Sequence, residues 1–336
     1  MAVGSNGDNK YNSSHYDEEG MTKCLLEESG PLLLFPKEKR KTVISFVFMA
    51  FGFLVNATSI ALTHDRVPDR EVVLPLPDIF LDNFTQIPQL MFVPDVLVIM
   101  SLLMTGSVIL LHPHRWILAR RTFFIIAVLY LLRSVTMFVT VLPVANKTVY
   151  CSPQVKSSSV SLLASRVIEL SIGGGMQISG LKKSCGDYIF SGHTVIMVTA
   201  MLIVRECKWC GSRKILVLPL VGEVSLTSMT SIFADSPAKF WFLHGISTLT
   251  AWGGMGILLL AHGHYTIDVI IGYYASTRMF WTYHVLANNA QLKAAKRWEF
   301  YGQAWWFKLF HYFEANVAAP LPKPRVTNLR LPFRFR

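Results

Sequence analysis

Charged residues are scarce in this chain. Asp, Glu, Lys and Arg make up 16% of its 336 residues, whereas apolar residues, Tyr included, make up 52%. This composition excludes an ordinary soluble domain, in which about 25% of residues are charged, and it indicates a membrane protein. Cysteine is scarce too, and five cysteines exclude a dense disulfide framework. A cleavable signal peptide is missing, because the first forty residues are polar and mixed in charge. The first apolar run is therefore expected to be a retained anchor.

Acidic residues are outnumbered by basic ones, 21 to 32, which gives a net charge of +11. Such an excess suits either nucleic-acid binding or the basic cytosolic loops of a membrane protein. The basic residues flank the apolar runs, as in the cluster Lys37–Lys41. We therefore predict membrane lipids as partners and no nucleic acid.

Six apolar runs have the length or the flanks of membrane helices, which need roughly 20 apolar residues. They are about Val43–Leu62, Val96–Leu111, Thr122–Leu142, Tyr188–Val204, Phe240–Ala261 and Ile267–His284. The predicted fold class is all-α, a polytopic membrane protein with six transmembrane helices. Residues 1–42 and 286–336 are predicted to be cytosolic tails around a membrane catalytic domain, 43–285, with a cytosolic insertion at about 207–234.

The distribution of Lys and Arg predicts the orientation. With the first tail in the cytosol, 23 of the 32 lie in cytosolic segments and 7 in outside loops, and two lie within spans. This bias places both termini in the cytosol. It also brings His193, His264 and Asp268 to the opposite, lumenal or extracellular face. The pattern Asn83-Phe84-Thr85 is a glycosylation acceptor on that same face.

Two short motifs could carry chemistry there. Ser191-Gly192-His193-Thr194 opens the fourth span, and the start of a helix favours phosphate through its unpaired N–H groups and its dipole. His264 and Asp268 are four residues apart, so on a helix the carboxylate can orient the imidazole. Taken singly, either motif is more often a structural hydrogen bond or a packed histidine. Their shared membrane face favours a catalytic site.

A third motif, Cys207-Lys208-Trp209-Cys210, has the spacing of half a zinc site. A second pair of ligands is missing, so we predict no metal. We predict no cofactor either.

Longer patterns carry a resemblance to known enzymes. S-G-H-T and H-Y-T-x-D are similar to motifs of the lipid phosphatase/phosphotransferase superfamily, related to type 2 phosphatidic acid phosphatases. C-G-D-x-x-x-S-G-H-T (Cys185–Thr194) and the pattern from His264 to His284 resemble the sphingomyelin synthase family more specifically. Leu74–Asp78 resembles its proline motif, and Arg133–Pro143 resembles its third-span motif. The likeness runs from about Lys41 to Pro320.

The resemblance implies a phosphatidylcholine:ceramide cholinephosphotransferase with the catalytic residues His193, His264 and Asp268. It implies a phosphohistidine on His264, formed from phosphatidylcholine with release of diacylglycerol. Ceramide then receives the phosphocholine, giving sphingomyelin. Candidate substrate-binding residues are Ser191, Gly192, Thr194, Tyr265 and Arg133. Arg133 could instead pair with a carboxylate such as Asp95 or Asp187.

One departure leaves the headgroup open. Gly263 stands where the family usually has an acidic residue, and a carboxylate there would lie beside the headgroup ammonium. The alternatives are therefore a ceramide phosphoethanolamine synthase, a lipid phosphate phosphatase in which water replaces ceramide, and a non-catalytic ceramide sensor. The resemblance implies the Golgi or the plasma membrane. The sequence leaves open the choice between them, the acyl-chain preference, the presence of a homo-oligomer and the authenticity of the 207–234 insertion.

Overall fold

The computed structural model describes residues 37–69, 72–112, 114–146, 151–154, 160–174, 185–206, 238–293 and 301–317. Within these ranges the chain is helical and has no β-strand, so the all-α prediction is confirmed there. The predicted insertion at 207–234 and the motif Cys207–Cys210 lie outside the described residues.

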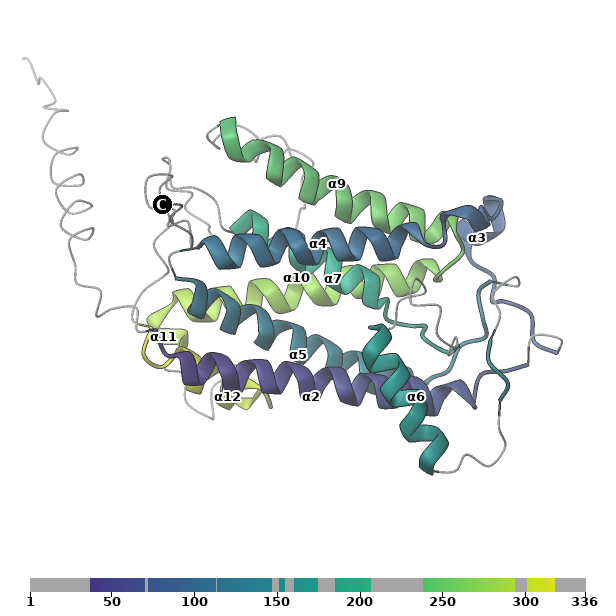
Figure 1. Ribbon diagram of the computed structural model, residues 1–336, viewed down its shortest axis with the longest axis horizontal. Helices are drawn as coiled ribbons and strands as arrows, with labels where there is room; N and C mark the ends of the chain where they lie inside the picture. Colours follow the sequence, from purple (N-terminus) through teal and green to yellow (C-terminus); the bar gives the residue numbers. More distant parts are fainter. Residues whose placement is uncertain are drawn as a thin grey trace, which may run out of the picture.

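Long helices run side by side and give the molecule its elongated shape (Figure 1). They are α2 (Lys39–His64), α4 (Val93–Leu111), α5 (Arg115–Val139), α7 (Gly192–Glu206), α9 (Ala238–Leu260) and α10 (Thr266–Asn288). Shorter helices lie at the two ends of this bundle: α3 (Ile79–Asn83), η2 (Pro88–Leu90), α6 (Val160–Gly173), α11 (Ala290–Lys293), η4 (Tyr301–Gln303) and α12 (Phe307–Glu314).

Each of the six predicted apolar runs overlaps one long helix. Several boundaries differ by a few residues, and two of these differences have a physical reason. Helix α5, which corresponds to the third predicted run, begins at Arg115, seven residues before the predicted start at Thr122. It extends that far because Arg120 and Arg121 are buried in ion pairs rather than solvated. Helix α7, which corresponds to the fourth predicted run, begins at Gly192 rather than at Tyr188. The residues before Gly192 form a loop that binds the start of α10, as described below.

Four helical segments are long and apolar enough to cross a membrane: Lys39–His64, Pro88–Leu111, Arg115–Val139 and Phe242–Leu260. The protein is therefore a membrane protein. Helix α7, with 15 residues, is shorter than a typical span. Helix α10 has 23 residues but lower hydropathy, with Asp268 and Arg278 in its sequence. The full count of six transmembrane helices stays a prediction.

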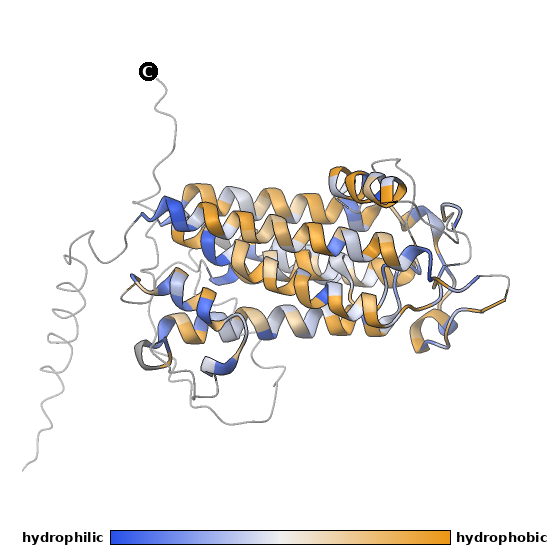
Figure 2. Cartoon of the chain, turned by 90° about the horizontal axis from the view of Figure 1, so that it is seen from below, coloured by the Kyte–Doolittle hydropathy of each residue, from blue (hydrophilic) through white to orange (hydrophobic). Residues whose placement is uncertain are grey.

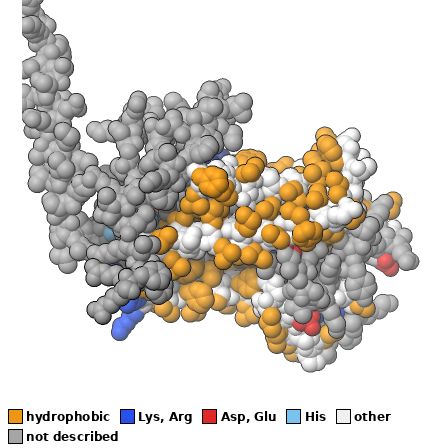
Figure 3. Space-filling view, turned by 45° about the horizontal axis from the view of Figure 1, so that its top comes forward, with side chains coloured by type: hydrophobic (Ala, Val, Ile, Leu, Met, Phe, Trp, Pro, Cys, Tyr) orange, Lys and Arg blue, Asp and Glu red, His pale blue; other side chains and the backbone are white. Residues whose placement is uncertain are grey.

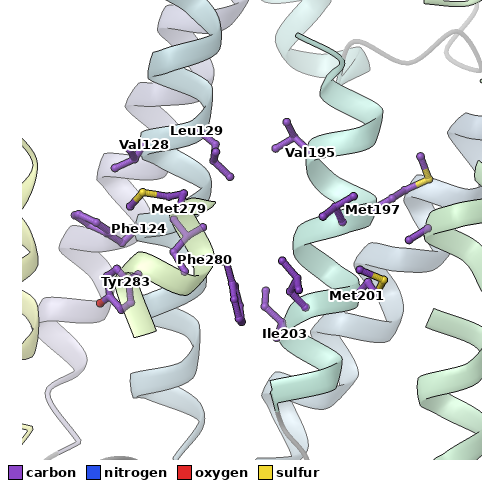
Figure 4. Packing of buried hydrophobic residues seen from close by; sticks show 14 of the residues in the cluster. Phe124, Val128, Leu129, Val195, Met197, Met201, Ile203, Met279, Phe280 and Tyr283 are labelled. Atoms are coloured by element: carbon purple, nitrogen blue, oxygen red, sulfur yellow. The ribbon is translucent and has the colours of Figure 1, made fainter. Parts of the chain in front are cut away.

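The helices are mostly hydrophobic along their length, with hydrophilic residues gathered toward their ends (Figure 2), and hydrophobic side chains cover much of the described surface of the bundle (Figure 3). Large side chains on several helices point outward: Phe46 is 50% exposed, Leu103 69% and Leu249 74%. Such a surface suits contact with lipid rather than with water. The interior is also apolar, and Phe124, Met197, Phe280 and Tyr283 pack together between the helices (Figure 4).

Small polar side chains join α2 to α5. Ser45 Oγ donates to the Arg120 carbonyl over 2.8 Å, and Ser59 Oγ donates to the Ser134 carbonyl over 2.9 Å. Both serines are buried. Hydroxyl-to-backbone hydrogen bonds of this kind hold helices together where lipid removes the hydrophobic driving force. Helix α5 is thereby fixed in position, and its far end carries Arg133 to the candidate site.

The segment 301–317 is packed against the bundle. Phe310, Phe313 and Glu314 of α12 are fully buried. Glu314 accepts two hydrogen bonds from Arg121, at 3.0 and 2.6 Å, and one from the Tyr283 hydroxyl at 3.0 Å. Burial alone would raise the pKa of the Glu314 carboxyl, but Arg121 outweighs burial and lowers it. Within the predicted C-terminal tail, this segment thus belongs to the core.

Candidate active site

The start of α10 holds one imidazole–carboxylate pair. His264 Nδ1 lies 3.2 Å from Asp268 Oδ2, and both side chains are buried. Asp268 stands at the third position of the helix, where its carboxylate also accepts the Tyr265 N–H over 3.0 Å. A second N–H, from Ile189 in the loop before α7, reaches Asp268 Oδ1 over 2.8 Å. The spacing of four residues therefore produces the predicted contact.

These hydrogen bonds select one tautomer of His264. Both backbone groups on Asp268 are donors, so the carboxylate acts as an ionised acceptor. It then accepts the proton on His264 Nδ1, and Nε2 keeps its lone pair. The positive end of the α10 dipole favours the same charged carboxylate. The imidazole is thus arranged to act as a nucleophile or a base through Nε2.

A second imidazole–carboxylate pair faces the first from other helices. His193 Nε2 lies 2.7 Å from Asp95 Oδ1, which joins the start of α7 to the first turn of α4. Asp95 is 1% exposed, whereas the His193 side chain is 18% exposed. The rings of His193 and His264 are 6.1 Å apart between centroids. A phosphodiester group can bridge that distance, with one imidazole on each side.

Sequence reasoning named Asp95 only as a partner for Arg133 and missed its contact with His193. The two residues are 98 positions apart, and no local pattern connects them. The available signal was the isolated carboxylate at the start of an apolar run, since a charge at that depth is usually paired or functional.

Arg133, near the end of α5, pairs with Asp187 and not with Asp95. Its guanidinium also donates to the Phe190 carbonyl over 2.6 Å and to Asn56 Oδ1 over 2.5 Å. The arginine thereby ties α2, α5 and the loop before α7 together. A Cβ added at Gly192 would meet the guanidinium carbon at 3.3 Å, so the glycine lets the arginine lie close against the first residue of α7.

A pocket that is partly open to the outside reaches Arg133 and His193. Its polar lining includes Asn56, Arg133, Asp187 and His193. Its apolar lining comes mainly from α2, α4 and α7, with Phe53, Ala57, Ile60, Val98 and Ile196. A pocket with a charged end and an apolar wall fits a molecule that has a phosphate headgroup and a hydrocarbon chain.

The remaining predicted site residues lie around the two histidines. Gly192 lines the pocket, while Ser191 and Thr194 are fully buried and do not line it. Ser191 Oγ accepts the Thr194 N–H over 3.3 Å, and Thr194 Oγ1 has no partner among the described residues. Tyr265 is 2% exposed, and its hydroxyl donates to the Pro143 carbonyl and accepts the Leu76 N–H. Tyr265 therefore holds two loops in place.

The proline motif also supports the start of α10. Asp78 begins α3 by accepting the Phe80 and Leu81 N–H groups, and it accepts two further hydrogen bonds from Thr266, at 2.8 and 2.6 Å. Burial would raise the pKa of Asp78, but these hydrogen bonds outweigh burial and lower it. Asp78 is thus an ionised brace between the segment before α4 and the turn that carries His264.

A disulfide braces the other side of the site. Cys151 and Cys185 are joined, and the Cys185 N–H donates to His64 Nδ1 over 2.9 Å at the end of α2. The remaining nitrogen of His64 lies 3.2 Å from the Ser152 carbonyl, which accepts its proton. Structural disulfides of this kind persist in oxidising compartments. Sequence analysis did not predict this bond, because cysteine counting cannot pair residues.

Among the described residues, no group of three or more His, Cys, Asp or Glu lies close enough together to hold a metal ion. The site is instead built from two imidazole–carboxylate pairs, a helix start and a guanidinium. Together these groups can bind a phosphate group and move protons to and from its oxygens.

Comparisons with known protein families and with individual proteins identify relatives of this chain. The PAP2 superfamily C-terminal family matches residues 184–285, which include His193, His264 and Asp268. Phosphatidylcholine:ceramide cholinephosphotransferase 2 of Mus musculus is 36% identical over 290 residues, covering 86% of this chain and 71% of that protein. The protein of the same name from Homo sapiens is also 36% identical, with the same coverage.

The chain belongs to the sphingomyelin synthase family. Phosphatidylcholine:ceramide cholinephosphotransferase 1 of Gallus gallus is 35% identical over 293 residues, or 87% of this chain. This chain spans 63% of the length of that relative.

Proposed function

We propose that this protein transfers phosphocholine from phosphatidylcholine to the primary hydroxyl of ceramide, giving sphingomyelin and diacylglycerol. The observation that carries the proposal is the pair of imidazoles 6.1 Å apart, each on its own carboxylate, beside a partly apolar pocket. The similarity to cholinephosphotransferases supports the choice of both substrates.

In the first half-reaction, His264 Nε2 attacks the phosphorus of phosphatidylcholine. The bond from phosphorus to the glycerol oxygen breaks, and a new bond joins phosphorus to His264. His193 donates a proton to the departing oxygen, so diacylglycerol leaves as a neutral alcohol. Asp268 stabilises the positive charge that the phosphorylated imidazole acquires, because its carboxylate is 3.2 Å from Nδ1.

In the second half-reaction, His193 removes the proton from the primary hydroxyl of ceramide. The hydroxyl oxygen attacks the phosphorus, the bond to His264 breaks, and sphingomyelin leaves. Asp95 holds the His193 ring and balances its charge whenever the imidazole is protonated. The start of α7 and the guanidinium of Arg133 stabilise the phosphoryl oxygens in both steps. This assigns phosphate binding to Gly192 and Arg133 and leaves Ser191, Thr194 and Tyr265 to shape the site around it.

We propose six transmembrane helices, with α7 and α10 completing the four long apolar ones, and both termini in the cytosol. The active site then faces the lumen of the Golgi or the exterior of the cell. The disulfide at that end and the positively charged segments at the other end support this orientation. A protease added from the cytosolic side should remove a tag from either terminus, and a protected C-terminus would contradict the proposal.

One assay tests the reaction and the headgroup together. Purified protein in vesicles receives fluorescent ceramide with either phosphatidylcholine or phosphatidylethanolamine, and the labelled product is separated by chromatography. We expect product from phosphatidylcholine, and none after His264→Ala. Product from phosphatidylethanolamine alone would assign the ethanolamine headgroup instead, whereas free phosphocholine without labelled product would indicate a hydrolase.

Gly263 makes the comparison of donors necessary. It lies between His262 and His264, and a Cβ there would meet Leu258 Cδ1 at 3.2 Å. No carboxylate therefore comes from this position to select a small ammonium headgroup. Residues elsewhere in the pocket must therefore distinguish the choline headgroup from the ethanolamine headgroup.

A further inference from the structure

The loop segment between α2 and α4 exposes many large apolar side chains at the active-site end of the bundle. Ile79 is 80% exposed, Leu74 69%, Phe92 58% and Phe84 50%. Val72, Val73, Leu76 and Ile87 are exposed as well. So many exposed apolar side chains within one segment are uncommon in contact with water, and large apolar patches usually mark a lipid or protein contact. We refer to residues 72–92 as the outer loop.

The outer loop continues directly into a lipid-facing surface. The apolar span Pro88–Leu111 begins within the loop, and on its helix Leu103 is 69% exposed. Figure 1 shows α3 at the end of the bundle beside α4 and α9. Helices α3 and η2 both contact α9, whose own outward side chains include Leu249 at 74%. The apolar surface of the spans and that of the loop are therefore one surface.

The charges of the loop suit the boundary between hydrocarbon and headgroups. No Lys or Arg occurs from Glu71 to His114. The Asp78 carboxylate is engaged with α3 and Thr266, and Asp82 accepts the Asp78 N–H over 3.0 Å. The Phe80 and Leu81 N–H groups of α3 bond to Asp78, and the Phe84 N–H bonds to the Phe80 carbonyl. The loop can therefore lie against acyl chains without exposing many unpaired polar groups.

The outer loop is also fastened to the turn that carries His264. Four contacts join them: the Leu76 N–H to Tyr265 Oη, Thr266 to Asp78, His262 Nε2 to the Phe84 carbonyl, and the Ile87 N–H to the Leu260 carbonyl. His262 adopts a left-handed backbone, with φ at 53°, within this turn. Such a conformation is uncommon for a residue with a side chain and persists where neighbouring contacts hold it.

We propose that the outer loop lies in the headgroup region of the outer membrane leaflet, with Ile79, Phe84 and Phe92 in contact with acyl chains. The partner of this surface is the lipid bilayer itself. Because the loop is bonded to residues 260–266, its insertion fixes the depth of His264 relative to the phosphates of the surrounding lipids. This inference rests on the proposed orientation of the active site and goes beyond the proposed reaction.

Single-cysteine labelling tests this placement in the full chain reconstituted in phosphatidylcholine vesicles. Cys24, Cys207 and Cys210 are replaced by Ser, and the disulfide is kept. An environment-sensitive fluorophore is attached to Phe84→Cys or to Thr85→Cys, which is the matched control. Phe84 has an extended backbone, so the next side chain points the opposite way. Two quenchers are compared, a doxyl group near the headgroup of phosphatidylcholine and aqueous iodide.

We expect the label on Phe84→Cys to be quenched mainly by the doxyl lipid and the label on Thr85→Cys mainly by iodide. Iodide quenching at both positions would overturn the inference. Protection from both quenchers would also overturn it, because a protein surface, such as a second copy of the chain, would then cover the loop. A label on Leu103→Cys separates this failure from a wrong topology, since doxyl quenching there shows that α4 itself is in the bilayer.

Discussion

Replacing Asp268 with Asn should remove both the catalytic charge and part of the support for the site. The carboxylate accepts three hydrogen bonds, from His264 Nδ1 and the Tyr265 N–H at Oδ2 and from the Ile189 N–H at Oδ1. An amide of the same shape has only one acceptor oxygen. Its NH₂ group must therefore face at least one buried donor. The least costly arrangement keeps the oxygen toward His264 and leaves the Ile189 N–H unpaired.

The expected magnitude follows from these contacts. One unpaired buried N–H costs about 1–3 kcal/mol of stability. The bond to His264 changes from charge-assisted to neutral, which halves its strength. If the NH₂ group faces His264 instead, the imidazole takes the opposite tautomer, and Nε2 loses the lone pair that attacks phosphorus. Losses of about 10⁴-fold accompany such a tautomer change in serine proteases. We therefore expect Asp268→Asn to slow transfer by about 10²- to 10⁴-fold.

The measurement compares the initial rate of sphingomyelin formation with thermal unfolding of the same detergent-solubilised protein. His264→Ala is the control, because it removes the nucleophile but leaves both backbone bonds of Asp268 in place. We expect His264→Ala to be inactive at near-normal stability and Asp268→Asn to lose rate and stability together. An Asp268→Asn protein that transfers phosphocholine at close to the unaltered rate would refute the assigned tautomer and the role of the carboxylate.

Asp95→Asn should lower the transfer rate and shift the pH–rate profile, because Asp95 acts through His193, and it should leave phosphatidylcholine binding unchanged. Loss of binding without an effect on the rate would contradict the role of Asp95 as the partner of His193. Glu314→Gln leaves the Arg121 guanidinium buried without its counterion and should cost about 3–5 kcal/mol in chemical unfolding. Because the folded pKa of Glu314 lies below its usual value, this stability is present at neutral pH and lost as the pH falls through that lowered pKa. Cys185→Ser opens a loop with a sequence separation of 34 and should cost about 2–4 kcal/mol, whereas equal stability with and without reductant would argue against the bond.

The parts of the fold that could be predicted from sequence are those set by local composition. Apolar runs of about 20 residues identify membrane helices, because the hydrocarbon thickness fixes their length. The contact at the start of α10 could also be predicted, because His264 and Asp268 are one helical turn apart and little else is needed to bring them together. The prediction for the fourth span was less accurate because the apolar Ile189 and Phe190 belong to a loop whose backbone serves the site.

The parts that sequence reasoning missed depend on long-range packing. The aromatic residues of α12 look like a membrane-surface tail when only composition is considered, and Glu314 gives no local sign of its partner Arg121, 193 residues away. Helix α6, in the predicted second outside loop, was not anticipated either. It is 14 residues long, which is too short to be recognised as a span. In each case the tertiary contact, and not the local pattern, decides the structure.

The two imidazole–carboxylate pairs show why these limits matter for function. The pair in α10 forms within one helical turn, so its geometry is retained wherever that helix forms. The pair of His193 and Asp95 exists only when α7 packs against α4. The proposed nucleophile, His264, is therefore prearranged locally, whereas the proposed proton donor, His193, depends on correct assembly of the bundle. A substitution that loosens the packing of α7 against α4 should accordingly impair proton transfer to the leaving diacylglycerol before it impairs the His264 nucleophile.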